Sequence, residues 1–216
     1  CDWSSDVCSS YLARSEQGNH RSNNEDYVLE VPADHLWVLA DGVGGRDAGE
    51  VASQLACEVV AAQVHKGVGL EQAIQHAHRA IKQAAREGQG RPGMATTIVA
   101  MLLYNGHYQI SWVGDSRAYK WTLETDLEQI THDHSLVQSL MDKGHLTPEQ
   151  AAAHPSKSVL NQALGQENLD QVEVDSIEGE LDDGQYLMLC SDGLSDYVGY
   201  EQIRACFSKD LPSKKI

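Results

Sequence analysis

The sequence predicts an α+β fold built from antiparallel strands and pairs of helices. Its clearest local signal is Asn105-Gly106, which lies between two β-rich runs and is a preferred dipeptide of two-residue hairpin turns. A pair of helical patterns, 48–65 and 70–87, precedes this hairpin. Because strands occur in runs rather than alternating singly with helices, we expect antiparallel layers instead of a parallel βαβ sheet.

The predicted elements follow one another as strands, two helices, a hairpin-rich sheet, a helical insertion, two more strands and a final helix. Apolar residues at spacings of three and four indicate the helices, whereas short apolar runs bounded by turn residues indicate the strands. Strands are expected at 27–31, 36–40, 96–103, 108–113, 117–121, 126–130, 172–177 and 186–190. Helices are expected at 48–65, 70–87, 134–144 and 195–208, with another short one starting at Thr147-Pro148.

Length and charge limit the classes of protein that this chain can represent. Its 216 residues suit one domain with a substantial core. There are 16 Lys and Arg against 32 Asp and Glu, and a net charge of −16 argues against nonspecific nucleic-acid binding and against anchoring on anionic membranes. The five cysteines form no CxxC pair, and Cys57 and Cys190 lie in apolar runs, which indicates a reducing, cytoplasmic setting.

The first twelve residues do not continue the pattern of the rest of the chain. Residues 1–12 are rich in Ser, Asp and Cys and lack the basic start and apolar centre of a signal peptide. We expect a non-native or disordered leader there and place a single domain at 13–216.

Two apolar strand patterns each lead into an Asp-Gly pair, at Asp41 and at Asp192. Asp-Gly after a strand is often a plain turn. Two such strand ends, however, could bring two carboxylates to one cation, and Gly42 lets the backbone approach a ligand closely. Hard oxygen ligands suit Mg²⁺ or Mn²⁺. A third acidic group lies at 24–26 and a fourth at Asp115.

Six short motifs occur along the chain in an order typical of one enzyme family. The motifs are Arg21-Ser22-Asn23-Asn24-Glu25-Asp26, Asp41-Gly42-Val43-Gly44-Gly45, Met94-Ala95-Thr96-Thr97, Val113-Gly114-Asp115-Ser116-Arg117-Ala118-Tyr119, Thr131-His132-Asp133-His134-Ser135 and Ser191-Asp192-Gly193-Leu194. With these motifs the chain resembles the metal-dependent Ser/Thr protein phosphatases (the PPM, or type 2C, family), especially their bacterial signalling members. The resemblance covers about residues 14–208.

The resemblance implies a four-layer αββα sandwich, in which two central antiparallel sheets lie between helix pairs. It also implies two, and with a weaker third site three, Mn²⁺ or Mg²⁺ ions at one edge of the sandwich. The implied ligands are Asp41 bridging two ions, the Gly42 carbonyl, Asp192, Asp115 for the third ion, and Glu25 and Asp26 through bound water.

The activity implied by the resemblance is dephosphorylation of phosphoserine and phosphothreonine proteins, which are substrates of a cognate Ser/Thr kinase. The implied catalytic residues are Arg21, Asp26 and Asp41. A water that bridges the metals would attack the phosphate in line, because two cations about 3.5–4 Å apart can ionise a shared water. Arg21 would hold the phosphate, since its planar guanidinium fits two phosphate oxygens.

The chain departs from the family pattern in places that bear on activity. Val43 stands where many eukaryotic members carry a histidine that is proposed as the general acid, so that role is unassigned. Ala95 stands where a glycine is usual. The family's last metal ligand, an Asp in a Gly-x-Asp-Asn segment near the C-terminus, has no counterpart before Ile216. The segment 134–165 resembles the family's flap beside the active site.

Three hypotheses follow from these residues. The first is an active protein phosphatase, and the second is a catalytically silent phosphatase-like domain, or an inactive fragment, that binds phosphoproteins or regulators. The absent last ligand favours the second, whereas Arg21, Asp41 and Asp192 favour the first. The third is a Ca²⁺-binding β-protein, which would gather its acids at short spacing in loops, unlike the acids here.

Overall fold

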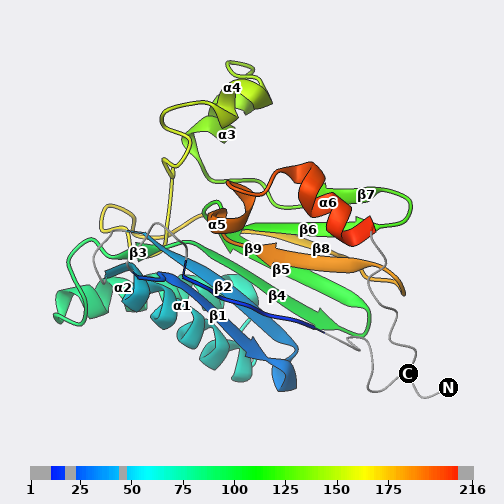
Figure 1. The fold of residues 1–216 in the computed structure, drawn as a ribbon. Helices are drawn as coiled ribbons and strands as arrows, with labels where there is room; N and C mark the ends of the chain where they lie inside the picture. The colour runs from blue at the N-terminus through cyan, green and yellow to red at the C-terminus, as the bar shows by residue number, and fades with distance from the viewer. Residues whose placement is uncertain (1–10, 18–22, 44–47, 209–216) are drawn as a thin grey trace.

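The computed structural model describes residues 11–17, 23–43 and 48–208, which form two antiparallel β-sheets packed face to face with helices outside (Figure 1). The first sheet has the strand order β1-β2-β4-β5-β8, with β3 also paired to β2. Its strands are β1 (Asp26–Val31), β2 (Leu36–Val43), β3 (Ala95–Thr96), β4 (Ile98–Tyr104), β5 (His107–Val113) and β8 (Asp175–Glu180). The second sheet, ordered β7-β6-β9, contains β6 (Arg117–Thr122), β7 (Asp126–Gln129) and β9 (Tyr186–Cys190).

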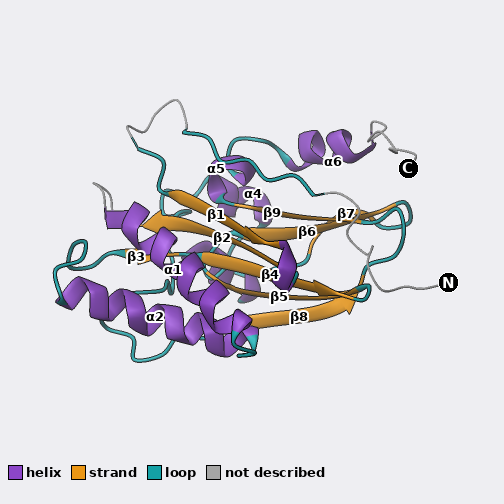
Figure 2. Cartoon of the chain, turned by 90° about the horizontal axis from the view of Figure 1, so that it is seen from below, coloured by secondary structure: helices purple, strands orange, loops and turns teal. Residues whose placement is uncertain are grey.

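Helices lie on both outer sides of this sandwich. The long helices α1 and α2 run along the first sheet, and α6 lies on the opposite side of the molecule (Figure 2). The helices are η1 (Pro32–Asp34, a 3₁₀ turn), α1 (Ala48–His65), α2 (Leu70–Arg86), α3 (Leu136–Asp142), α4 (Pro148–Ala152), α5 (Asp192–Ser195) and α6 (Tyr200–Ser208). The predicted α+β sandwich is therefore confirmed, as are the predicted positions of α1 and α2.

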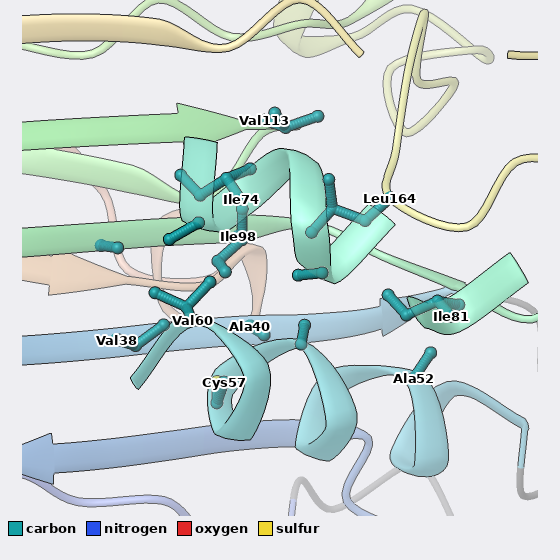
Figure 3. Close-up of a cluster of buried hydrophobic side chains, with 14 of the residues drawn as sticks. Val38, Ala40, Ala52, Cys57, Val60, Ile74, Ile81, Ile98, Val113 and Leu164 are labelled. Carbon is teal, nitrogen blue, oxygen red and sulfur yellow. The ribbon is translucent and has the colours of Figure 1, made fainter. Parts of the chain in front are cut away.

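The largest apolar core lies between the first sheet and the helix pair α1 and α2 (Figure 3). Ile74 and Ile81 of α2 are fully buried there, and each such side chain stabilises the fold by roughly 1.5–3 kcal/mol. On α1 the buried side chains include Ala52 and Ala56, which are small. Small residues on this face let the helix approach the sheet closely, so the strand that carries Asp41 lies under a tightly packed layer.

Strand β2 is buried on both of its faces. Val38 and Ala40 belong to the core under the helices, whereas Trp37 belongs to the core between the two sheets. This division follows from the two-residue period of a strand. A third cluster, in which Tyr119 of β6 and Ile203 of α6 take part, completes the stack of layers on the far side.

Local turn and cap predictions are confirmed. Tyr104 pairs with His107 across Asn105 and Gly106, whose φ angles of 52° and 77° are those of a tight hairpin turn with two left-handed residues. Thr147 caps α4 through a complete capping box. Both features depend on neighbouring residues alone, which is why the sequence predicts them well.

Several predicted boundaries were wrong, and the strand expected at 96–103 is divided into β3 and β4 at Thr97. The strand expected at 172–177 begins only at Asp175, because the backbone of Val172 is bound to the Gln75 side chain of α2 instead of a neighbouring strand. The helix expected at 195–208 begins only at Tyr200 as α6, whereas Ser195 is the last residue of the separate helix α5. The central strand expected to end at residue 40 continues to Val43.

The segment carrying α3 and α4 projects from the sandwich as a separate lobe (Figure 1). At its base, an antiparallel β-bridge joins Ser135 and Leu160, and Asn161 N donates a 2.8 Å hydrogen bond to His134 O. Farther out, Lys157 Nζ donates to Asp196 Oδ2, 2.7 Å away, just after α5. The lobe therefore contacts the element that begins with Asp192.

Most of the leader predicted at 1–12 lies outside the described residues, and Tyr11 and Leu12 are exposed. The last eight residues, 209–216, also lie outside the described part. In the part of the chain that the structure describes, we find no helix with the length and apolarity that a bilayer crossing requires.

Candidate metal centre

Two of the predicted acids face each other on neighbouring strands. Asp26 is the first residue of β1, and it lies opposite Asp41 of β2 in the antiparallel register. Only 7% of Asp41 is exposed. We expected Asp41 at the end of its strand, but β2 continues for two residues beyond it, and β1 pairs with Asp41 on one side.

The third acid comes from the second sheet. Asp192 is the first residue of α5 and follows β9 directly after Ser191. The Ser191 hydroxyl donates a 2.7 Å hydrogen bond to Oδ2 of Asp26. This bond joins β1 of the first sheet to the end of β9 in the second, so the acids meet where the two sheets come together at one end.

The charges of these carboxyls act on one another. Burial, followed by the charges of Asp26 and Asp192, raises the pKa of Asp41 to about 9, and a hydrogen bond with Asp192 and the charge of Asp115 add to the effect. Burial and the charge of Asp192 raise the pKa of Asp115 to about 7, although Arg117 opposes this rise. Four acids from separate parts of the chain therefore interact within one site.

A glycine contact brings the backbone carbonyl of Gly42 close to the Glu25 carboxyl. Gly42 N donates to Glu25 O at 3.1 Å. A Cβ on Gly42 would lie 2.3 Å from the carbonyl carbon of Gly49 in the first turn of α1, so only glycine fits. A Cβ placed on Gly49 would be 3.0 Å from both Gly42 O and the Glu25 carboxyl carbon. The Gly42 carbonyl and the Glu25 carboxyl thus border the same small space.

Arg117 has the structural role that the sequence indicated. It forms a two-pronged pair with Asp133, in which Nη2 is 2.6 Å from Oδ2 and Nε is 3.0 Å from Oδ1. Gln129 Nε2 donates to the same carboxylate at 3.0 Å. This pair anchors the chain between β5 and β6, which carries Asp115.

The donor set fits a hard divalent cation. Within residues 11–17, 23–43 and 48–208, no three His, Cys, Asp or Glu side chains converge into a complete metal site. Mg²⁺ and Mn²⁺ nevertheless bind through one or two carboxylates, carbonyls and several waters. A cation would reverse the repulsion that raises the pKa of Asp41 and Asp115. We therefore judge that the residues present fit such ions.

Not every predicted residue can be placed. Arg21, expected to hold phosphate, lies outside the described residues, as do Gly44 and Gly45. Val43 is 38% exposed and carries no proton to donate. The residues that sequence reasoning missed are Ser191, which stands next to Asp192 in a quoted motif, and Gly49, which no local pattern distinguishes.

Comparisons with known proteins agree with this architecture. The family model of protein phosphatase 2C matches residues 17–212. The serine/threonine protein phosphatase PstP of Mycobacterium tuberculosis is 40% identical over 203 residues, which are 89% of this chain and 38% of PstP. The protein phosphatase PhpP of Streptococcus pneumoniae is 33% identical over 210 residues, which are 92% of this chain and 84% of PhpP. The chain thus spans well under half of PstP's length.

A solved structure extends the likeness to three dimensions. The catalytic domain of PstP, solved in complex with 2 manganese ions, superimposes with a TM-score of 0.77 at 37% identity. The match covers 91% of this chain and 83% of that one. With a family model over most of its length, this chain belongs to the protein phosphatase 2C family.

Proposed function

We propose that this chain is a metal-dependent phosphoserine/phosphothreonine protein phosphatase. The observation that carries the proposal is the electrostatic interaction of the buried Asp41 with Asp26, Asp115 and Asp192. These acids come from β1, β2, the turn after β5 and the start of α5, and so a cation there would hold both sheets together. The name of the relative PstP, a serine/threonine protein phosphatase, supports the same activity, and PhpP is named a protein phosphatase.

In this proposal the ions are Mn²⁺ or Mg²⁺. Asp41, the Gly42 carbonyl and Asp192 would hold these ions. Asp115 would bind a weaker third ion. Glu25 and Asp26 would act through bound water, and the Ser191 hydroxyl orients the Asp26 carboxylate for that role.

Catalysis would combine charge neutralisation with proton transfer. Bound divalent ions would offset the charge of the phosphate and lower the pKa of an attacking water. Arg21 would bind two phosphate oxygens through its guanidinium and align the phosphorus for in-line attack. Asp26, held by Ser191, would accept a proton from water. Val43 cannot protonate the leaving serine or threonine oxygen, so we assign that proton to solvent.

The substrates in this proposal are phosphoproteins made by a cognate Ser/Thr kinase, and the setting is the cytoplasm. Cys57 and Cys190 are buried free thiols, which supports a reducing compartment. We also propose that residues 134–165 form a flap that borders the substrate path. The contact of Lys157 with Asp196, close to Asp192, supports that location.

The first test is Mn²⁺-dependent hydrolysis of a phosphothreonine peptide. We expect turnover that EDTA abolishes and that Asp192→Ala lowers by at least about a hundredfold, because a first ligand is lost. Asp183→Ala is the control. It removes an exposed carboxylate in the turn between β8 and β9, away from the contact of the flap with Asp196.

Calorimetric titration of the metal-free protein with MnCl₂ gives a second readout that does not depend on turnover. Asp192→Ala should weaken Mn²⁺ binding, whereas Asp183→Ala should leave it near the wild-type value. Turnover that persists in EDTA, or equal loss in both variants, would contradict the proposed site.

A further inference from the structure

The ladder between β2 and its neighbours is interrupted beside Asp41. Strand β4 pairs with β2 up to Val99, and β3 pairs with β2 again from Thr96, in the same register. That register places Thr97 opposite Asp41, yet Thr97 belongs to neither strand and separates β3 from β4. The interruption thus lies at a residue proposed to hold the ions.

Threonine hydroxyls replace part of the ladder at this position. Thr97 N donates to Asp41 O in the usual way, at 2.8 Å. The Asp41 N–H donates to the Thr97 hydroxyl, 3.2 Å away, while the Thr97 carbonyl accepts from the Thr96 hydroxyl at 2.9 Å. The Thr96 hydroxyl also lies 2.8 Å from Asp41 O. Thr96 and Thr97 are fully buried, so water cannot take over these bonds.

The Thr97 hydroxyl also reaches the chain segment that carries Asp115. It lies 2.7 Å from the hydroxyl of Ser116, which is buried as well. Gly114 has a φ of 111°, and a Cβ there would lie 2.6 Å from Cβ and Cγ2 of Thr97. The threonine side chain therefore contacts both neighbours of Asp115, one through its hydroxyl and the other through its methyl group.

We propose that Thr97 is a positioning residue that couples Asp41 to Asp115. The inference rests on the proposed function, in which both acids bind cations. A single hydroxyl accepts the Asp41 N–H and shares its other hydrogen bond with Ser116, so a displacement of one acid is transmitted to the other. Mg²⁺ and Mn²⁺ sites require accurate ligand placement, and groups that orient ligands change metal affinity by about 10–100-fold.

The test compares Thr97→Val with Thr97→Ser. Valine keeps the shape and the methyl contact with Gly114 but removes the hydroxyl, whereas serine keeps the hydroxyl and removes the methyl. In calorimetric titrations with MnCl₂, we expect Thr97→Val to weaken binding by at least about tenfold. Thr97→Ser should stay within about threefold of wild type, because the bonds to Asp41 and Ser116 persist.

Hydrogen exchange of the Asp41 amide in the metal-free protein tests the first bond without any metal. Thr97→Val should speed this exchange relative to the amides of β4, while Thr97→Ser should preserve protection. Ser116→Ala tests the second bond. It should weaken Mn²⁺ binding and leave the Asp41 amide protected, since Thr97 still accepts that N–H.

Wild-type Mn²⁺ affinity and wild-type Asp41 exchange in Thr97→Val would overturn the coupling. If Thr97→Val does not fold, Ser116→Ala becomes the deciding variant. Unchanged Mn²⁺ binding by Ser116→Ala would overturn the proposed coupling as well. Failure of the proposed function has a different signature, because the wild-type chain itself would then neither bind Mn²⁺ nor hydrolyse phosphothreonine.

Discussion

Replacing Asp41 with asparagine should stabilise the metal-free protein and at the same time remove its cation binding. Burial and the neighbouring acids raise the pKa of Asp41 from an ordinary 3.8 to about 9. Keeping such a carboxyl inside the fold at pH 7 costs about 4 kcal/mol relative to the unfolded chain. Asparagine has nearly the same shape and carries no charge. Because four acids share the repulsion, we expect a gain of about 2–4 kcal/mol at pH 7.

The sign of the pH dependence follows from proton binding. Between the ordinary pKa near 4 and the folded-state pKa of about 9, the native protein binds more protons at Asp41 than the unfolded chain does. The metal-free wild type therefore loses stability as the pH rises through this window. Asp41→Asn does not lose stability in this way. The difference in the free energy of unfolding between the two proteins should therefore be small near pH 4 and grow toward pH 9.

Urea unfolding in EDTA at pH 5.5, 7 and 8.5 measures this difference in free energy. In thermal unfolding the same difference should appear as a shift in Tm of about 5–15 °C. Asp183→Asn, which removes an exposed carboxylate elsewhere, is the control and should show little change. With MnCl₂ in place of EDTA the order should reverse, since only the wild type gains binding energy. A metal-free Asp41→Asn protein that is no more stable than wild type at pH 8.5 would refute the reasoning.

Three further predictions concern the frame around the site. Burial lowers the pKa of His78, and the charges of a nearby Lys and Arg act in the same direction, although its hydrogen bond to a backbone carbonyl and the charge of an Asp oppose them. The contribution of His78 to stability is therefore present above about pH 6.5 and falls as the pH drops below that value. Urea unfolding between pH 7.5 and 5.5 should therefore be less pH-dependent in His78→Gln. Arg117→Lys loses the two-pronged pair with Asp133 and should cost about 1–3 kcal/mol by the same assay, and an unchanged midpoint would rule out a structural role. Gly42→Ala forces a Cβ against the backbone of Gly49, so we expect a loss of about 3 kcal/mol or more, visible in thermal unfolding.

The His78 prediction depends on a contact between distant parts of the chain. Its Nδ1 accepts from Gly165 N at 3.1 Å, and its Nε2 donates to Leu169 O at the same distance. The Lys82 ammonium donates to the same carbonyl. A protonated ring could not accept the Gly165 N–H, and it would add a positive charge beside Lys82. Acid should therefore loosen the segment that returns from the projecting lobe to the sandwich.

The sequence by itself determined the elements whose cause is local. The three-and-four spacing of apolar residues predicted α1 and α2, and Asn105-Gly106 predicted the β4–β5 hairpin because two left-handed residues suit that turn. The acids were also visible in the sequence, since Asp41 and Asp192 each follow an apolar run. Periodicity and turn chemistry act over a few residues, so they can be read without the fold.

The tertiary structure alone decided what depends on partners far along the chain. Val172 was predicted to lie in a strand but is held by Gln75, 97 residues away. The bond between Ser191 and Asp26 spans 165 residues. A motif in the sequence contains Thr97, but only the strand pairing shows that its hydroxyl accepts the Asp41 N–H. Burial and mutual repulsion, which set the chemistry of the four acids, arise only when the two sheets come together.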